Sequence, residues 1–192
     1  MQAIPTLYES KFKYQFLNTI SPIFQNSELT FLSKIISDED ISRYISERKL
    51  FDCTSMLRRF NPPTTKGHKR KVVEFDGVNG NKFKLSYREN AKNPLDFCVG
   101  LYLIREETGE EFILKRYNGK NHWHTNKFPK GKRFFDFHIH RATKKCQENR
   151  EHEEDFATIT NEYSTARQAL ECILRDCGFQ YEQSNFSAWG YS

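Results

Sequence analysis

The chain reads DFCVGLYLI from Asp96 to Ile104, and this stretch decides the class of the fold. It is nearly all apolar, which is typical of the most buried strand at the centre of a sheet. The segments around it alternate between apolar and polar residues. Before it, Phe83, Leu85 and Tyr87 share one face of a predicted strand. Short connections between such segments predict an antiparallel meander of about five to six strands.

Helices are expected on both sides of this sheet. Apolar residues recur with loose helical spacing over residues 1–60, and Ser37 is a candidate N-cap for a helix with three acids in its first turn. A stretch rich in proline and threonine then predicts a linker. After the sheet, Ser164 is a candidate N-cap for a helix whose apolar stripe begins at Ala166.

These patterns predict an α+β fold. We expect a helical N-terminal region, followed by a curved antiparallel sheet of about five to six strands with C-terminal helices packed on one face. The expected boundaries are residues 1–62 for the helical region, 68–180 for the sheet with its C-terminal helices, and 181–192 for a tail.

Composition narrows the class of protein. At 192 residues the chain is long enough for a sizeable core, and its 15% aromatic residues supply large buried area. The five cysteines are odd in number and match no CxxC zinc pattern. The N-terminus lacks the features of a signal peptide, and no apolar run approaches the roughly 20 residues that span a bilayer. We therefore expect a cytoplasmic protein with reduced thiols and no membrane partner.

Charge is distributed unevenly along the chain, whose net charge is +5. Residues 115–145 hold ten Lys or Arg against the single acid Asp136, whereas residues 147–162 hold six acids against Arg150 alone. The basic block predicts a surface that faces a polyanion, and an ordinary charge-mixed surface is the plainer alternative.

Four of the six histidines form two His-x-His pairs, His122-Trp123-His124 and His138-Ile139-His140. We expect each pair to lie on a strand, over residues 122–128 and 133–140. Side chains two apart on a strand point to the same face. A turn near Lys130-Gly131 would set the two pairs side by side, so we expect four imidazoles in one patch.

Alternation assigns a face to the second pair. Phe137 and Ile139 belong to an apolar face that must point to the core, so His138 and His140 share the opposite face with Asp136. A carboxylate beside an imidazole fixes its tautomer and raises its basicity. We therefore expect Asp136 to orient one histidine.

Three interpretations of this segment compete. Two histidines could act as general base and acid while Lys and Arg hold a phosphate, as in metal-free cleavage of RNA by its own 2′-hydroxyl. The imidazoles could instead ligate zinc, iron or manganese. The surface could also bind nucleic acid or protein without chemistry, through Trp123 and Tyr117 among cations. The plainest alternative is that exposed strand positions merely happen to be histidine.

Two motifs resemble those of an uncharacterised prokaryotic protein family. They are RYNGKNHWHTN over residues 116–126 and FDFHIHRAT over residues 135–143. The likeness covers roughly residues 80–180 and implies no function, because that family has none to transfer. The layout is also similar to that of bacterial endoribonuclease toxins, by architectural analogy only.

We expect a nucleic-acid-directed protein, in the first instance a metal-independent endoribonuclease of toxin type with no cofactor and no metal ligand. The alternative is a non-catalytic binder of nucleic acid or of a nucleoprotein complex, such as a phage-encoded inhibitor of host defence. A metal-dependent enzyme using the two His-x-His pairs is the third. The expected partners are RNA or another nucleic acid, and an antitoxin or nucleoprotein.

The candidate catalytic residues are His122, His124, His138, His140 and Asp136. The candidate residues for binding phosphate or nucleic acid are Arg116, Tyr117, Lys120, Lys127, Lys130, Lys132, Arg133, Arg141 and Lys144.

Overall fold

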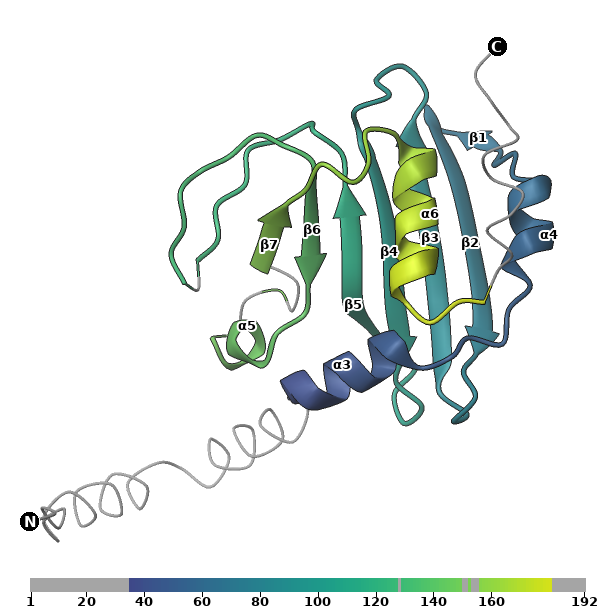
Figure 1. Ribbon diagram of the computed structural model, residues 1–192, viewed down its shortest axis with the longest axis vertical. Coiled ribbons are helices and arrows are strands. Elements are labelled where there is room, and N and C mark those ends of the chain that lie inside the picture. The colour runs from purple at the N-terminus through teal and green to yellow at the C-terminus, as the bar shows by residue number, and fades with distance from the viewer. Residues whose placement is uncertain (1–34, 128, 150–151, 153–155, 181–192) are drawn as a thin grey trace, which may run out of the picture. The chain divides into compact units, whose positions relative to one another are not determined.

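The computed structural model describes residues 35–127, 129–149, 152 and 156–180 (Figure 1). The described residues from Ile36 onward belong to one compact unit. Its main element is one seven-stranded sheet, in which the strands follow sequence order and every neighbouring pair is antiparallel. The strands are β1 (Thr64–Thr65), β2 (His68–Asp76), β3 (Lys82–Asn90), β4 (Phe97–Ile104), β5 (Glu111–Asn118), β6 (His138–Arg141) and β7 (Phe156–Ile159).

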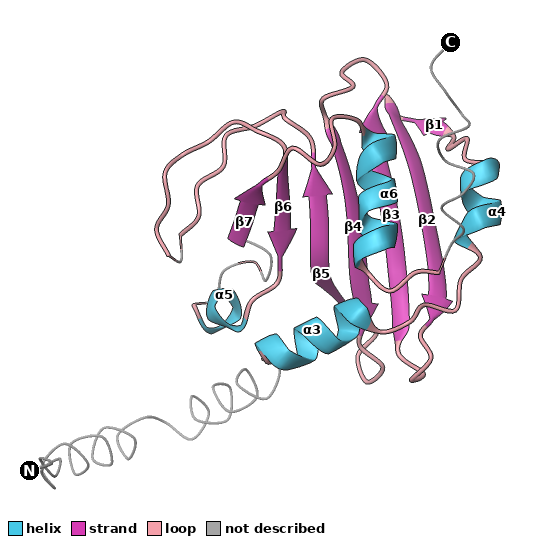
Figure 2. Cartoon of the chain, viewed as in Figure 1, coloured by secondary structure: helices cyan, strands magenta, loops and turns pink. Residues whose placement is uncertain are grey.

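Four short helices of the described residues accompany the sheet (Figure 2). They are α3 (Asp38–Ser46), α4 (Cys53–Arg58), α5 (Lys144–Glu148) and α6 (Ala166–Asp176). Ser37 is confirmed as the N-cap of α3, because its side chain accepts a hydrogen bond from the Asp40 N–H. The N-cap of α6 is Thr165, one residue beyond the predicted Ser164. No helix in the described part of the chain is long and apolar enough to span a membrane.

The hydrophobic core lies between α6 and the sheet. The helix packs across β3, β4 and β5 and contributes Leu170 and Ile173, both fully buried. The prediction for the central strand is confirmed: β4 is fourth of seven strands, and its alternate residues Phe97, Val99 and Leu101 are at most 1% exposed. Apolar residues of α3 and α4 belong to the same core.

Asp176, the last residue of α6, ties this helix to β5. Its carboxylate accepts hydrogen bonds from the Tyr117 hydroxyl at 2.5 Å and from Nε of Arg175 at 2.8 Å, and lies 3.3 Å from Nζ of Lys115. Burial opposes the charge, but the hydrogen bonds from Arg175 and Tyr117 outweigh it and hold the pKa of Asp176 below its usual value. The charged carboxylate therefore stabilises the docked helix at neutral pH.

The predicted fold is wrong in its emphasis on helices. The described chain is mostly an antiparallel sheet with few short helices, and the expected helical N-terminal region is not supported. The helices predicted within residues 1–34 lie outside the described residues. Within residues 35–62 only α3 and α4 occur, nine and six residues long.

Two strand predictions also need correction. Of the strand predicted over residues 122–128, the described residues 122–127 form only isolated bridges, and the strand predicted over residues 133–140 is reduced to β6. Two further strands were not predicted: β1 lies in the predicted linker, and β7 lies in the acidic stretch of residues 147–162. These two edge strands have only two and four residues, too few for an alternating pattern to show in the sequence.

Candidate functional site

After β5 the chain leaves the sheet in a long loop over residues 119–137, which we call the arm; only its Phe128 lies outside the described residues. The two halves of the arm meet through isolated bridges, at His124–Phe134 and at Lys127–Lys130. Asn126 fastens the arm to β7. Its Oδ1 accepts from the Ala157 N–H and its Nδ2 donates to the Ala157 carbonyl oxygen, each at 2.8 Å. The arm is therefore a folded cover over β6 and β7.

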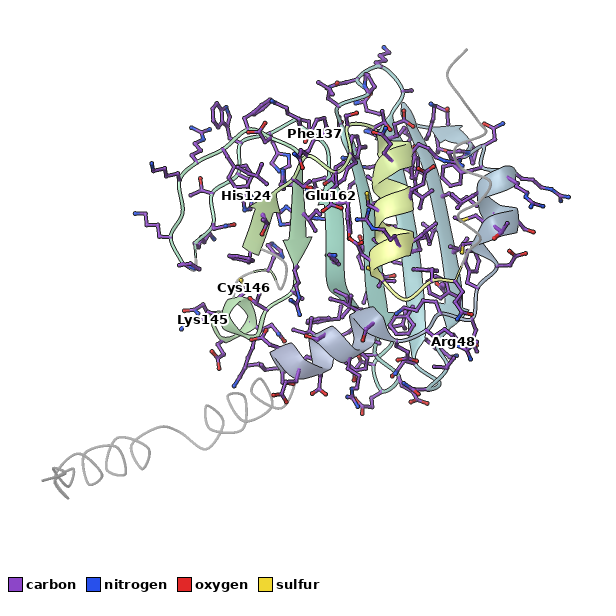
Figure 3. All side chains as sticks on the ribbon, viewed as in Figure 1. Arg48, His124, Phe137, Lys145, Cys146 and Glu162 are labelled. Atoms are coloured by element: carbon purple, nitrogen blue, oxygen red, sulfur yellow. The ribbon has the colours of Figure 1, made fainter. Side chains whose placement is uncertain are left out.

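The four histidines of the two His-x-His pairs lie together between the arm and β6, and we call them the histidine cluster. The ring of His138 is at the centre, with centroid distances of 5.1 Å to His122, 5.4 Å to His124 and 4.8 Å to His140. His124 is also 4.8 Å from His140. Figure 3 shows His124 beside β6 and β7. The sequence-based expectation of one patch therefore agrees with these ring contacts.

The cluster differs from the expected open surface in its burial. His138 and His140 are 0% and 2% exposed, His124 is partly buried and His122 is exposed. Phe137 and Ile139 pack against the main core, as alternation predicted. His138 and His140 point to the other face, but the arm covers that face. The prediction of a solvent-facing pair on β6 is therefore wrong.

A β-bulge places two more polar residues beside the cluster. β4 and β5 shift register between Leu101 and Tyr102, so strand alternation reverses partway along β5. Tyr117 consequently points to the core, while Arg116 and Asn118 pair with His140 and His138 on β6. Directly paired residues share a face, so both lie on the side of the histidines.

Each of three histidines has one ring nitrogen bonded to a carbonyl oxygen. Nδ1 of His138 lies 2.6 Å from the backbone oxygen of Asp136, Nε2 of His124 lies 3.0 Å from Oδ1 of Asn126, and Nδ1 of His122 lies 2.6 Å from Oδ1 of Asn121. A carbonyl oxygen can only accept, so these three nitrogens carry the ring protons. The second nitrogen of each neutral ring keeps its lone pair.

The side-chain amides of Asn121 and Asn126 are held with their oxygens toward the histidines, the orientation that these hydrogen bonds require. Asn126 is fixed by its two bonds to Ala157, and Nδ2 of Asn121 donates to Oδ1 of Asp96 at 2.7 Å. Their oxygens are thereby turned to the histidines. The expected role of Asp136 needs correction: its backbone oxygen orients His138, whereas its carboxylate pairs with Lys120 at 2.9 Å.

The surroundings disfavour the charged form of two cluster histidines. Burial lowers the pKa of His138 to about 4, and repulsion from Arg116 and from any protonated His122 or His124 acts in the same direction, against the hydrogen bond to the Asp136 backbone. Burial also lowers the pKa of His122. Both imidazoles are therefore uncharged at pH 7, the form that can coordinate a metal ion.

Three residues predicted to bind phosphate make their contacts outside the cluster, and these are Tyr117, Arg141 and Lys144. Tyr117 is fully buried in the core, so its predicted role on a nucleic-acid surface is wrong. Arg141 bonds to Ser42 of α3 at 2.7 Å. The backbone of Lys144 bonds to Asp38 of α3, and its Nζ lies 3.5 Å from Glu148. Arg141 and Lys144 thus belong to the contacts between α3, β6 and α5.

The outer surface of the arm carries the remaining predicted residues. Trp123 is 56% exposed, and the guanidinium carbon of Arg133 lies 4.6 Å from its ring centroid. The ring of Phe135 lies 5.4 Å from that of Trp123. Three exposed lysines accompany them, Lys127, Lys130 and Lys132. The arm therefore joins a basic, aromatic outer surface to the histidines beneath it.

Sequence reasoning missed the residues that support the cluster, above all Asn118, Asn121 and Tyr163. The Tyr163 hydroxyl lies 3.1 Å from the backbone oxygen of Asn118 and 2.8 Å from that of His138, and so joins β5 to β6 below the site. Asn118 and Asn121 lie within the motif of residues 116–126, but nothing in that motif assigns them a role. Asn126 did carry a signal, because it continues the alternation of His122 and His124.

Comparisons of the chain with family models, with curated proteins and with solved structures give no match.

Proposed function

We propose that the protein is an endoribonuclease that holds single-stranded RNA on the arm and cleaves it at the histidine cluster. The observation that carries the proposal is the exposed indole of Trp123 with Arg133 against its ring. Aromatic rings combined with arginine are the elements on which single-stranded nucleic acids stack. Trp123 also stands between two cluster histidines in the chain, which puts a bound strand next to His122.

The charge of the arm supports a polyanionic ligand. Between residues 119 and 137 the sequence has five basic residues and one acid, Asp136, and the structure pairs that acid with Lys120. The arm therefore carries more positive than negative charge along its sequence. Cations beside stacking rings bind the phosphates of a single strand, so affinity should fall steeply with salt.

The proposed reaction uses the RNA itself as the nucleophile. The 2′-oxygen attacks phosphorus while its proton is removed, and the bond from phosphorus to the 5′-oxygen breaks as that oxygen gains a proton. The products are a 2′,3′-cyclic phosphate and a 5′-hydroxyl. His122 is the exposed member of the cluster and is the group that meets the scissile phosphate, with Arg116 beside the cluster to balance developing charge.

The test is incubation of the purified full chain with a random pool of labelled single-stranded RNA and with DNA of the same length, in buffer containing divalent metal ions. We expect RNA fragments with cyclic phosphate ends, no DNA products, and at least about 100-fold slower cleavage by His122→Ala. His152→Ala is the matched control, because His152 is an exposed histidine outside the cluster. Equal cleavage by His122→Ala and the control would refute the assignment.

One observation favours a second candidate function, binding of RNA without cleavage. His138 and His140 are buried, so two of the four imidazoles cannot reach a substrate directly. In that case the outer surface of the arm would bind RNA, and the histidines would take no part in a reaction. Salt-sensitive binding that depends on Trp123, with intact RNA recovered from every incubation, would establish this alternative over the nuclease.

A further inference from the structure

The geometry points to a metal centre inside the histidine cluster. One ring nitrogen from each of His122, His124 and His138 lies within 4.8 Å of one nitrogen of the other two. We propose that these three imidazoles bind a divalent transition-metal ion, zinc in the first instance. Three neutral imidazoles with a fourth position left open are a donor set of catalytic zinc sites.

Small movements would complete the site. Zinc–nitrogen bonds of about 2.0–2.1 Å in a tetrahedral site separate the ligand nitrogens by about 3.4 Å. Three nitrogens at most 4.8 Å apart reach that spacing if each moves by roughly 0.8 Å toward their common centre. His122 and His124 both belong to the arm, and His122 is exposed, so rotation of its side chain meets little packing resistance.

The hydrogen bonds around the cluster are those of prepared ligands. Histidines that bind a metal almost always donate their other ring N–H to a carbonyl or carboxylate oxygen, which fixes the tautomer. Here all three do so, to the backbone of Asp136 and to the side chains of Asn126 and Asn121. Three rings that are each held by an acceptor at one nitrogen would be unnecessary if the histidines only filled space.

Asn118 provides an independent observation. Its side chain is buried, with Nδ2 3.5 Å from Nε2 of His138, and its Oδ1 has no hydrogen-bond partner among the described residues. A buried acceptor without a partner costs about 1–3 kcal/mol. A water molecule bound at the open position of the metal would donate a hydrogen bond to Oδ1 of Asn118. The metal centre would therefore explain why this buried oxygen is placed beside the histidines.

This inference deepens the proposed nuclease, and its catalytic consequence rests on that proposal. With an ion bound, His122 would hold the ion, and the ion in place of His122 would meet the scissile phosphate. A metal at this site would polarise a phosphate oxygen and lower the pKa of its bound water toward neutrality. It would also explain why a nuclease site includes the fully buried His138. The earlier expectation of metal-independent cleavage would then be replaced by cleavage that a chelator stops.

The test measures metal binding directly. The full chain is stripped with a chelator and titrated with Zn²⁺ by calorimetry and with Co²⁺ by visible absorption, and its metal content is counted after dialysis. We expect one ion per chain, at least tenfold weaker binding by His122→Ala, and unchanged binding by His152→Ala. Because His122 is exposed, its replacement leaves the fold intact, which circular dichroism verifies.

Two results would overturn the metal centre. One is the absence of stoichiometric Zn²⁺ or Co²⁺ binding by the wild-type chain, and the other is equal affinity of His122→Ala and His152→Ala. A cobalt–thiolate charge-transfer band would place the ion on cysteines and have the same effect. RNA cleavage that persists in chelator would refute the role of the metal in cleavage but support the proposed nuclease. A zinc-bound protein that does not cleave RNA would refute the proposed nuclease but support the metal centre.

Discussion

Replacing Asn126 with alanine is expected to release the arm from β7. The side chain makes two hydrogen bonds of 2.8 Å to Ala157 and accepts a third from His124 at 3.0 Å. At about 1 kcal/mol for each bond to Ala157, docking of the arm weakens by roughly 2 kcal/mol. Since about 1.4 kcal/mol is a factor of ten, the undocked population should rise about 30-fold.

Amide hydrogen exchange at Ala157 reports this change at a single site, because that N–H donates to Asn126. We expect its exchange to be about 30-fold faster in Asn126→Ala, with amides of the buried β4 unchanged. Thr125→Ala, at the exposed neighbouring position, is the matched control. An Ala157 exchange rate that is the same in both variants would refute the docking of the arm through Asn126.

The remaining predictions concern binding, pH and metal. Trp123→Ala should weaken binding of single-stranded RNA by about 1–3 kcal/mol in a fluorescence titration, and Trp123→Phe should retain most of the affinity. Asp176→Asn should lower the urea midpoint at pH 7, because a carboxyl with a depressed pKa stabilises the fold only while it is charged. This deficit should shrink between about pH 5 and pH 3, where the wild-type carboxylate loses its contribution; a deficit constant with pH would contradict it. Zinc at about 100 times the Kd of the wild type should stabilise the wild type by about 2.7 kcal/mol in thermal unfolding, and His122→Ala, with at least tenfold weaker binding, by at most about 1.4 kcal/mol. Equal stabilisation of both would place the ion elsewhere.

The centre of the fold was predictable from the sequence. The apolar run of β4 can bury both of its faces only at the centre of the sheet, not at an edge. The acids after Ser37 mark the start of α3 because they favour the first turn of a helix. The face of β6 followed from its alternation. These features depend on residues close in sequence, which is why a pattern reveals them.

The burial of the site was not predictable in the same way. The alternation that starts at Phe112 and Leu114 would have placed Arg116 on the core side of β5 and Tyr117 on the opposite side. The β-bulge between β4 and β5 reverses these two positions. His138 is buried because the arm that precedes it in the chain folds back over β6. Both effects arise from tertiary contacts, such as that between Asn126 and Ala157, that leave no periodic trace.

X-ray absorption at the zinc edge of the loaded full chain tests the central claim most directly, since it reports which atoms surround the ion. The convergence of His122, His124 and His138 predicts three imidazole nitrogens at about 2.0–2.1 Å and an oxygen, such as that of water, as the fourth ligand. A sulfur shell near 2.3 Å, or a spectrum of hydrated zinc without imidazole scattering, would contradict it.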